Sequence, residues 1–241
     1  MKENRMYSDR IKNIPVMRYC GFSCVYCAFQ KFQKISKCQD CRDNKNHSHL
    51  EVLQRNPPQT AIGKFLTVGL SGDVSFMHQN EFAVVLGYCH DWNSRTFLIQ
   101  SKNPTYFLPF NHMIPPNVII GTTIETESDI FLTDHNTTYY KNISSAPTPY
   151  NRITAMLELT CRKAVTIEPI LEFDLRILTE MIKGIEPEFV YVGYANDHKA
   201  GMKLKLPEPS IEKTMQLINE LKRDGIDVRE KSLRPAWWEN V

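Results

Sequence analysis

Residues 14–29 read IPVMRYCGFSCVYCAF. The stretch begins with a short apolar segment that predicts a β-strand, and a cysteine-rich loop follows it directly. Tyr26 stands immediately before the last cysteine of this loop, and the cysteines have the spacing C-x3-C-x2-C: Cys20, Cys24 and Cys27. Three thiolates on one tight loop can ligate three irons of a cubane cluster and leave the fourth iron open to a small molecule. We therefore predict that these cysteines bind a 4Fe-4S cluster.

Two simpler interpretations of the triplet are a structural zinc site and three unrelated buried cysteines. Zinc sites usually have four ligands in paired C-x2-C units, and the triplet does not match that pattern. The chain has 241 residues and seven cysteines, and the odd number suits metal ligation in a reducing compartment better than a disulfide framework. We expect the thiols to be reduced.

The rest of the chain alternates short apolar segments with helical periodicity. Seven segments predict strands: Ile14–Met17, Phe65–Leu70, Thr96–Ile99, Val118–Ile120, Ala164–Ile167, Phe189–Val192 and Ile226–Val228. Strands that are apolar throughout and alternate with helices predict a parallel sheet covered by helices, in a doubly wound sheet or in a full or partial barrel. Of these α/β folds we predict a partial (β/α)6-type barrel.

Two helices have clear start and stop signals. One covers residues 174–184, with Asp174 as the cap and Gly184 as the stop, and the other runs from Ser210 to Gly225. Residues 30–61 are polar and weakly periodic, which predicts an elaborated loop inserted after the first strand. We expect a single domain over residues 1–241, with a C-terminal strand and tail over 226–241.

The sequence resembles the radical S-adenosylmethionine (SAM) superfamily, first through the cysteine triplet with its preceding aromatic residue. Further blocks resemble a phage- and archaeal-type branch of unknown function that is distantly similar to spore photoproduct lyase: LTVGLSGDVSF, FLIQSKNP, VIIGTTIETE, AVTIEPILEFDL, FVYVGYAND and KSLRPAWWE. The resemblance covers nearly the whole chain. It implies a partial barrel with a 4Fe-4S cluster at its open, C-terminal end, where SAM is cleaved reductively to a 5′-deoxyadenosyl radical that abstracts hydrogen from a substrate.

Polar residues that follow the predicted strands are candidates for SAM contacts, because barrel enzymes build their sites at the C-terminal ends of strands. The resemblance implies that the second-strand motif contacts the SAM amino group and that the later strand ends contact its carboxylate and ribose hydroxyls. Besides Tyr26, the candidates are Ser71, Gly72, Asp73, Ser101, Lys102, Thr122, Thr123, Glu125, Glu168, Asn196 and Asp197. The last three of these could face either SAM or the substrate. The simpler interpretation is that these are ordinary loop and cap residues.

A second group of soft ligands lies in the predicted insertion. Cys38 and Cys41 form a C-x2-C pair, with His47 and His49 close behind. A small zinc site is chemically reasonable, and so is a second Fe-S cluster completed by Cys89 or Cys161. Against both, HSHLEVL resembles a histidine-and-glutamate motif of the same branch, which would give His49 a separate role near the active site. Cys89 and Cys161 stand apart from the other cysteines, and the simplest interpretation is that each is a small buried apolar group.

The C-terminal tail carries aromatic and basic residues. Trp237 and Trp238 could close the barrel or stack on a base, and we expect them to pack in the core. Basic residues of the tail could hold phosphate or form a solvated segment: Arg229, Lys231 and Arg234.

Composition excludes few functions. A formal net charge of +2 gives only weak attraction to nucleic acid. The apolar runs are too short to span a membrane and the N-terminus has no signal-peptide core, so we expect a cytoplasmic protein without a membrane partner. The resemblance implies a one-electron donor such as flavodoxin or ferredoxin, and a substrate that could be a nucleic acid, a peptide or a small molecule.

Two other functions compete with the radical SAM interpretation. One is a metal-stabilised nucleic-acid-binding protein without SAM chemistry, which would contain zinc and lose affinity steeply with salt. The other is an Fe-S enzyme that transfers a different fragment of SAM. The products formed from SAM distinguish this last possibility from hydrogen abstraction.

Overall fold

The computed structural model describes residues 7–27, 36–133, 136–195 and 204–239. The elements in chain order are β1 (Arg10–Ile14), α2 (Gln39–Arg42), η1 (Leu50–Gln54), β2 (Phe65–Val68), η2 (Val74–Phe76), α3 (Gln79–Asp91), β3 (Phe97–Gln100), η3 (Pro104–Met113), β4 (Val118–Thr123), β5 (Ile130–Thr133), β6 (Asn136–Tyr139), η4 (Tyr140–Asn142), α4 (Pro149–Glu158), β7 (Arg162–Ile167), α5 (Leu175–Ile185), β8 (Phe189–Val192), α7 (Ile211–Arg223) and β9 (Asp227–Glu230). Within these described ranges, no helix has the length and apolar character needed to span a membrane.

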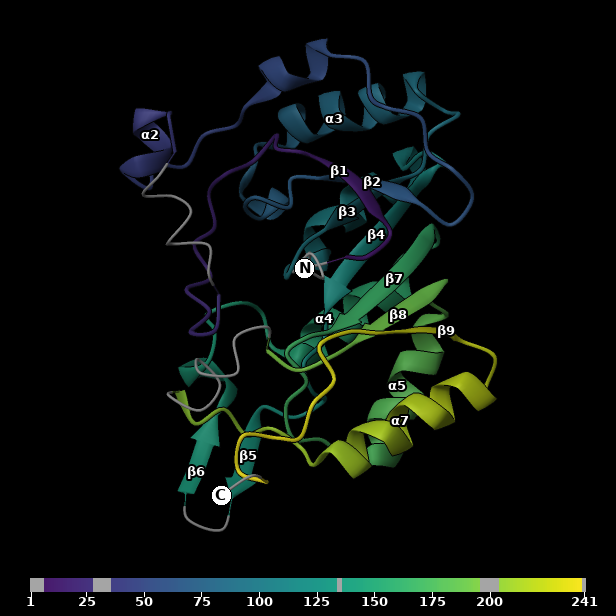
Figure 1. The fold of residues 1–241 in the computed structure, drawn as a ribbon. Coiled ribbons are helices and arrows are strands. Elements are labelled where there is room, and N and C mark those ends of the chain that lie inside the picture. The colour runs from purple at the N-terminus through teal and green to yellow at the C-terminus, as the bar shows by residue number, and fades with distance from the viewer. Residues whose placement is uncertain (1–6, 28–35, 134–135, 196–203, 240–241) are drawn as a thin grey trace. The chain divides into compact units, whose positions relative to one another are not determined.

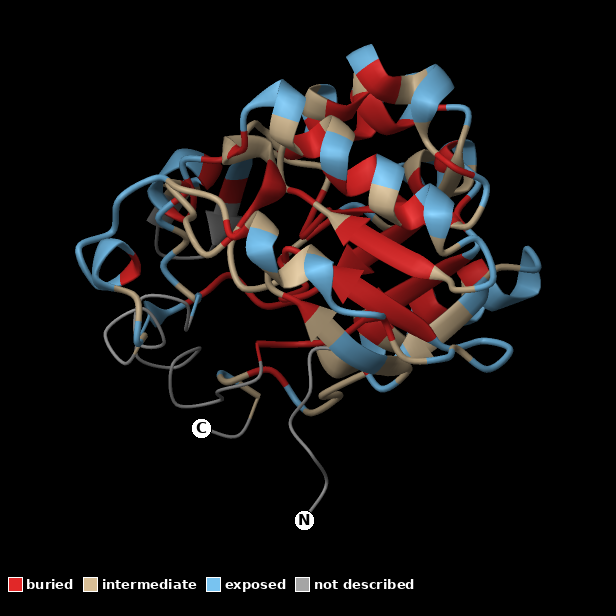
Figure 2. Ribbon diagram, turned by 90° about the horizontal axis from the view of Figure 1, so that it is seen from above, coloured by how far each residue is buried: buried red, intermediate tan, exposed pale blue. Residues whose placement is uncertain are grey.

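Seven strands form one sheet in the order β1-β2-β3-β4-β7-β8-β9, and β5 and β6 form a separate antiparallel hairpin. Neighbours from β1 to β4 and from β7 to β9 pair in parallel. Strands β2, β4 and β8 are buried at every position, and Figure 2 shows buried strands in red beneath the helices. Burial along whole strands is typical of parallel sheets covered by helices.

The chain divides into two compact units. The first contains β1 to β3, most of β4, and α3, whose buried residues are Phe82, Val85, Leu86 and Cys89. The second contains the end of β4, the β5–β6 hairpin and the elements from β7 to β9. In this second unit α5 contacts both α4 and α7 (Figure 1).

All seven predicted strands are present, but the first lies earlier than predicted. Strand β1 ends at Ile14, whereas the prediction began there. The predicted segment is buried, since Val16 and Met17 are fully inaccessible, but beyond Ile14 only Met17 pairs, through an isolated antiparallel bridge with Ser48. The apolar residues therefore identified a buried segment that follows the strand. The strand itself, β1, is an edge strand with mostly polar side chains.

Both predicted helices are confirmed. The side chains of Asp174 and Ser210 cap α5 and α7 by accepting hydrogen bonds from the backbone N–H groups of Ile177 and Lys213. The predicted stop of the first helix at Gly184 is wrong. The helix ends at Ile185, and its C-cap residue Glu186 adopts the left-handed conformation, with φ of 55°. The predicted insertion is described from residue 36 onward and contains α2 and η1.

Candidate functional site

The cysteine loop follows β1 and presents its thiols near the surface. Cys20 and Cys24 are partly exposed and Cys27 is exposed. All seven cysteines of the chain lie in described segments, and none forms a disulfide. Three accessible thiols within eight residues fit the soft ligand set that an Fe-S cluster requires.

The middle of the cysteine loop is held by the segment that follows η4. The backbone N–H of Val25 donates to the carbonyl of Ile143 at 2.9 Å, and Ser145 donates from its backbone N–H and its hydroxyl to the carbonyl of Phe22. The Cys24 Sγ lies 3.1 Å from the Ser144 Oγ. These contacts fix the loop backbone around Cys24 independently of any metal.

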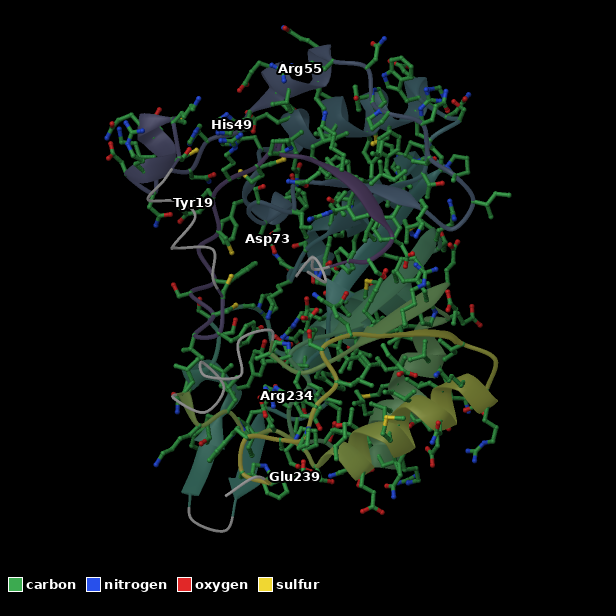
Figure 3. The ribbon with its side chains drawn as sticks, viewed as in Figure 1. Tyr19, His49, Arg55, Asp73, Arg234 and Glu239 are labelled. Atoms are coloured by element: carbon green, nitrogen blue, oxygen red, sulfur yellow. The ribbon has the colours of Figure 1, made fainter. Side chains whose placement is uncertain are left out.

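The loop after β2 packs against the backbone that leads into the cysteine triplet. The backbone N–H of Asp73 donates to the carbonyl of Tyr19 at 2.9 Å (Figure 3). A Cβ atom at Gly72 would lie 2.5 Å from that same carbonyl oxygen, closer than real Cβ contacts allow. Glycine is therefore required at this position for the two segments to approach so closely. Tyr19 immediately precedes Cys20, so the predicted SAM motif lies beside the first cysteine of the triplet.

Asp73 also connects the ends of β2 and β3. Its buried carboxylate caps η2 by accepting from the backbone N–H and the hydroxyl of Ser75, at 3.0 and 2.8 Å. The Ser101 hydroxyl donates to Oδ1 at 2.5 Å, and the Lys102 backbone N–H donates to Oδ2 at 2.8 Å. Three residues predicted from different strand ends, Asp73, Ser101 and Lys102, are thus brought together. Ser71 is held separately, because its Oγ accepts from Asn13 of β1 at 2.8 Å.

Glu125 lies at the centre of a buried polar network in the second unit. Its side chain is fully buried, and its Oε1 accepts hydrogen bonds from the hydroxyls of Tyr26 and of Tyr140, the latter at 2.9 Å. Its Oε2 pairs with Arg152 at 2.8 Å, and Arg152 is also fully buried. The same guanidinium donates to the carbonyl of Thr123, to the Tyr140 hydroxyl and to the carbonyl of Pro147.

This network sets the ionisation of its members. Burial and the adjacent Glu125 carboxylate raise the pKa of the Tyr26 phenol well above its usual value, so the phenol remains a hydrogen-bond donor. Burial is the largest single influence on Arg152 and lowers its pKa, but Glu125, Tyr140 and Tyr26 together outweigh burial and the pKa is raised. The aromatic residue of the cysteine motif is therefore tied to a charged pair after β4. In this geometry Glu125 holds protein groups, and its predicted contact with ribose hydroxyls stays a prediction.

Glu168 lies at the end of β7 and forms an ion pair with the tail. Its Oε2 lies 3.0 Å from Lys231 Nζ, and both side chains are largely buried. Asn196 and Asp197 lie outside the described residues. The contacts of Thr123 and Glu168 are thus with protein groups, and their SAM roles stay predictions.

The tail has partners within its own unit. Arg234, which is labelled in Figure 3, forms two hydrogen bonds with the buried carboxylate of Glu208, at 2.7 and 2.8 Å. Arg229 pairs with Asp227. The expectation of core packing for the two tryptophans is wrong, since Trp238 is 45% exposed and Trp237 is partly exposed. Their indole N–H groups donate to backbone carbonyls instead, at 2.7 and 2.8 Å.

Sequence reasoning missed three residues that contact Cys24 or Glu125: Tyr140, Ser144 and Arg152. The position of Arg152 had a signal in the sequence. It falls on the same face of α4 as Ile153 and Met156, and an arginine on a buried helix face requires a buried partner. Nothing in the sequence around Tyr140 or Ser144 sets them apart from ordinary loop residues.

No protein-family model matches the sequence, and no curated protein matches it in sequence. Solved structures do match the fold. A mutant spore photoproduct lyase with dinucleoside spore photoproduct has a TM-score of 0.60 and 9% identity, over 91% of this chain and 76% of that one. SuiB of Streptococcus suis bound to precursor peptide SuiA has a TM-score of 0.56 and 9% identity, over 96% and 51%. SuiB bound to S-adenosylmethionine gives 0.51 and 9%, over 92% and 50%.

These neighbours are radical SAM enzymes, and the chain therefore has the fold of that superfamily. The predicted α/β class and partial barrel are confirmed. Identities this low show a relation of fold, and the chain spans about half the length of SuiB.

Proposed function

We propose that this protein is a radical SAM enzyme that binds a 4Fe-4S cluster through Cys20, Cys24 and Cys27 and cleaves SAM reductively. The observation that carries the proposal is the C-x3-C-x2-C triplet in the loop after the first strand of a radical SAM fold. A reduced cluster would supply the electron that splits SAM into methionine and a 5′-deoxyadenosyl radical able to abstract hydrogen from a substrate. A donor such as flavodoxin or ferredoxin would reduce the cluster, and a reducing compartment such as the cytoplasm would protect the thiols.

The residues around the cysteine triplet would position the cysteine loop and bind SAM. Asp73 already accepts four hydrogen bonds from protein donors, so we assign it a positioning role. The SAM amino group would then be bound by backbone carbonyls of the loop that contains Ser71 and Gly72. Lys102 has its backbone fixed by Asp73, and its ammonium group suits the SAM carboxylate. Tyr26, anchored on Glu125, would restrict the conformation of the chain directly before Cys27.

Cluster binding is tested by anaerobic reconstitution with iron and sulfide. We expect about four irons and four sulfides per chain, and an electron paramagnetic resonance (EPR) signal of the reduced protein that changes when SAM is added. Each alanine variant of the triplet should lose the cluster, whereas Cys161→Ser, a partly exposed cysteine outside the motif, should keep it.

Two results would contradict the proposal. One is a Cys24→Ala protein that retains the full cluster and its response to SAM. The other is a wild-type protein that takes up no iron and binds nucleic acid with an affinity that falls steeply with salt, which is the behaviour of the metal-stabilised binding protein.

A further inference from the structure

Four potential metal ligands converge in the described part of the insertion, away from the cysteine triplet in sequence. The ligand atoms of Cys38, Cys41, His47 and His49 all lie within 4.8 Å of one another. The His47 Nε2 lies 3.3 Å from the Cys38 Sγ and 3.5 Å from the Cys41 Sγ, and the His49 Nε2 lies 3.2 Å from the Cys41 Sγ. A tetrahedral zinc ion, with Zn–S near 2.3 Å and Zn–N near 2.0 Å, holds sulfur and nitrogen about 3.5 Å apart.

The outer nitrogens of both imidazoles are already used. His47 Nδ1 lies 2.9 Å from the carbonyl of Lys45, and His49 Nδ1 lies 3.0 Å from the Glu51 carboxylate. Because both partners are acceptors, Nδ1 carries the proton in each ring, and the lone pair of each Nε2 faces the sulfurs. This arrangement, with an oxygen acceptor behind each histidine, is typical of metal-binding imidazoles.

The sulfur atoms suit the same role. Neither Cys38 nor Cys41 forms a disulfide, and the Sγ atom of each lies beside an imidazole nitrogen. Two sulfur atoms and two imidazole nitrogens that lie together form the set of soft and borderline ligands that suits a zinc ion.

The geometry favours one ion over an Fe-S cluster. In a two-iron cluster with two cysteines and two histidines, each pair of ligands binds its own iron, which separates the sulfurs from the nitrogens. Here sulfur and nitrogen are in contact. Cys89 is not needed to complete the ligand set, and it is fully buried within α3.

The helices in the described part of the insertion bury few side chains. Helix α2 has four residues and buries only Cys41, and η1 buries none of its residues. A segment that cannot form an apolar core depends on a metal or a disulfide for its structure. The last ligand also contacts the main fold, since the His49 backbone N–H donates to the carbonyl of Val16 at 2.7 Å. Met17 pairs with Ser48 in the same place, three residues before Cys20.

We propose that Cys38, Cys41, His47 and His49 bind a structural zinc ion that folds the insertion and anchors it to the segment leading into the cysteine triplet. The site is independent of SAM cleavage, because none of its ligands belongs to the triplet. A zinc ion here would fix the position of the chain just before Cys20 whether or not the cluster is present.

The test uses full-length protein with Cys20, Cys24 and Cys27 all changed to alanine, so that iron at the triplet cannot contribute. We expect about one zinc per chain by elemental analysis, and a cobalt-substituted form with intense visible absorption and a sulfur-to-cobalt charge-transfer band. Cys41→Ser should lose the metal, and Cys161→Ser should retain it. His47→Cys should still bind zinc whereas His47→Gln should not, which separates ligation from packing. If the triple variant does not fold, the wild-type protein reconstituted with iron should contain the zinc in addition.

A second readout follows the insertion itself. Chelation should increase trypsin cleavage after Arg42 and Lys45 by about tenfold, because the insertion would unfold locally. A protein that retains less than a tenth of an equivalent of zinc would overturn the proposal. So would iron and sulfide in place of zinc in the triple variant, or full zinc content in Cys41→Ser.

Discussion

Removal of Arg152 should destabilise the protein strongly. Arg152 and Glu125 are both fully buried and lie 2.8 Å apart, and the guanidinium also donates to the carbonyl of Pro147. Changing Arg152 to methionine keeps most of the side-chain volume but leaves a buried carboxylate without its cation. Breaking one partner of a buried pair costs about 3–5 kcal/mol. For a chain of this size the melting temperature should fall by about 6–20 °C.

The measurement is thermal and guanidinium unfolding by circular dichroism, under nitrogen and without SAM. The matched control is Lys222→Met, which removes an exposed ion pair with Glu230 and should cost no more than about 1 kcal/mol. The double variant Glu125→Gln/Arg152→Met should be more stable than the sum of the single changes by at least about 1 kcal/mol, because glutamine needs no cation. A cost for Arg152→Met within the range of the control, or strict additivity, would refute the reasoning.

Three substitutions test the contacts around the triplet. Gly72→Ala should lower the cluster content, because the new Cβ would lie 2.5 Å from the carbonyl of Tyr19. The control Gly87→Ala, whose new Cβ has nothing within 4 Å, should instead stabilise α3 by about 0.5–1 kcal/mol. Equal cluster contents in the two variants would contradict this prediction. Asp73→Asn places an amide among donors and should cost about 1–3 kcal/mol in urea unfolding and weaken SAM binding, so unchanged SAM affinity would argue against its positioning role. Tyr26→Phe should cost about 1–3 kcal/mol and hasten cluster loss in air, and a wild-type rate of loss would show that its bond to Glu125 does not support the loop.

The sequence predicted the strands well because buried parallel strands are apolar throughout. The predicted segment Phe189–Val192 matches β8 residue for residue, and the other buried strands differ from their predictions only at their ends. The first strand was displaced because its pairing depends on the backbone while its side chains are mostly polar. The β5–β6 hairpin was missed, since Asn136–Tyr139 carries mainly polar residues and lies outside the main sheet.

The contacts within the candidate site were predictable from the sequence only where the order of the strands alone determines which residues lie together. Asp73, Ser101 and Lys102 come together because neighbouring parallel strands end at the same edge. The roles of Tyr140 and Arg152 were not predictable, because their network depends on how η4 and α4 pack around Glu125. Such contacts join residues from separate elements, and no local pattern records them.

The proposed zinc ligands were also only partly predictable from the sequence. The C-x2-C pair and the two histidines were evident in the sequence, but their spacing left zinc, a second Fe-S cluster and a separate role for His49 all open. The contacts between sulfur and nitrogen, and the acceptors behind each imidazole, give the preference for a single ion.

Product analysis tests the central claim most directly. The reconstituted protein is reduced with dithionite in the presence of SAM, and the nucleosides are identified by mass spectrometry, with Cys20→Ala as the control. The radical SAM interpretation predicts 5′-deoxyadenosine and methionine from the wild type and neither from the variant. Intact SAM in the presence of a fully assembled cluster, or a product that retains a different fragment of SAM, would contradict it.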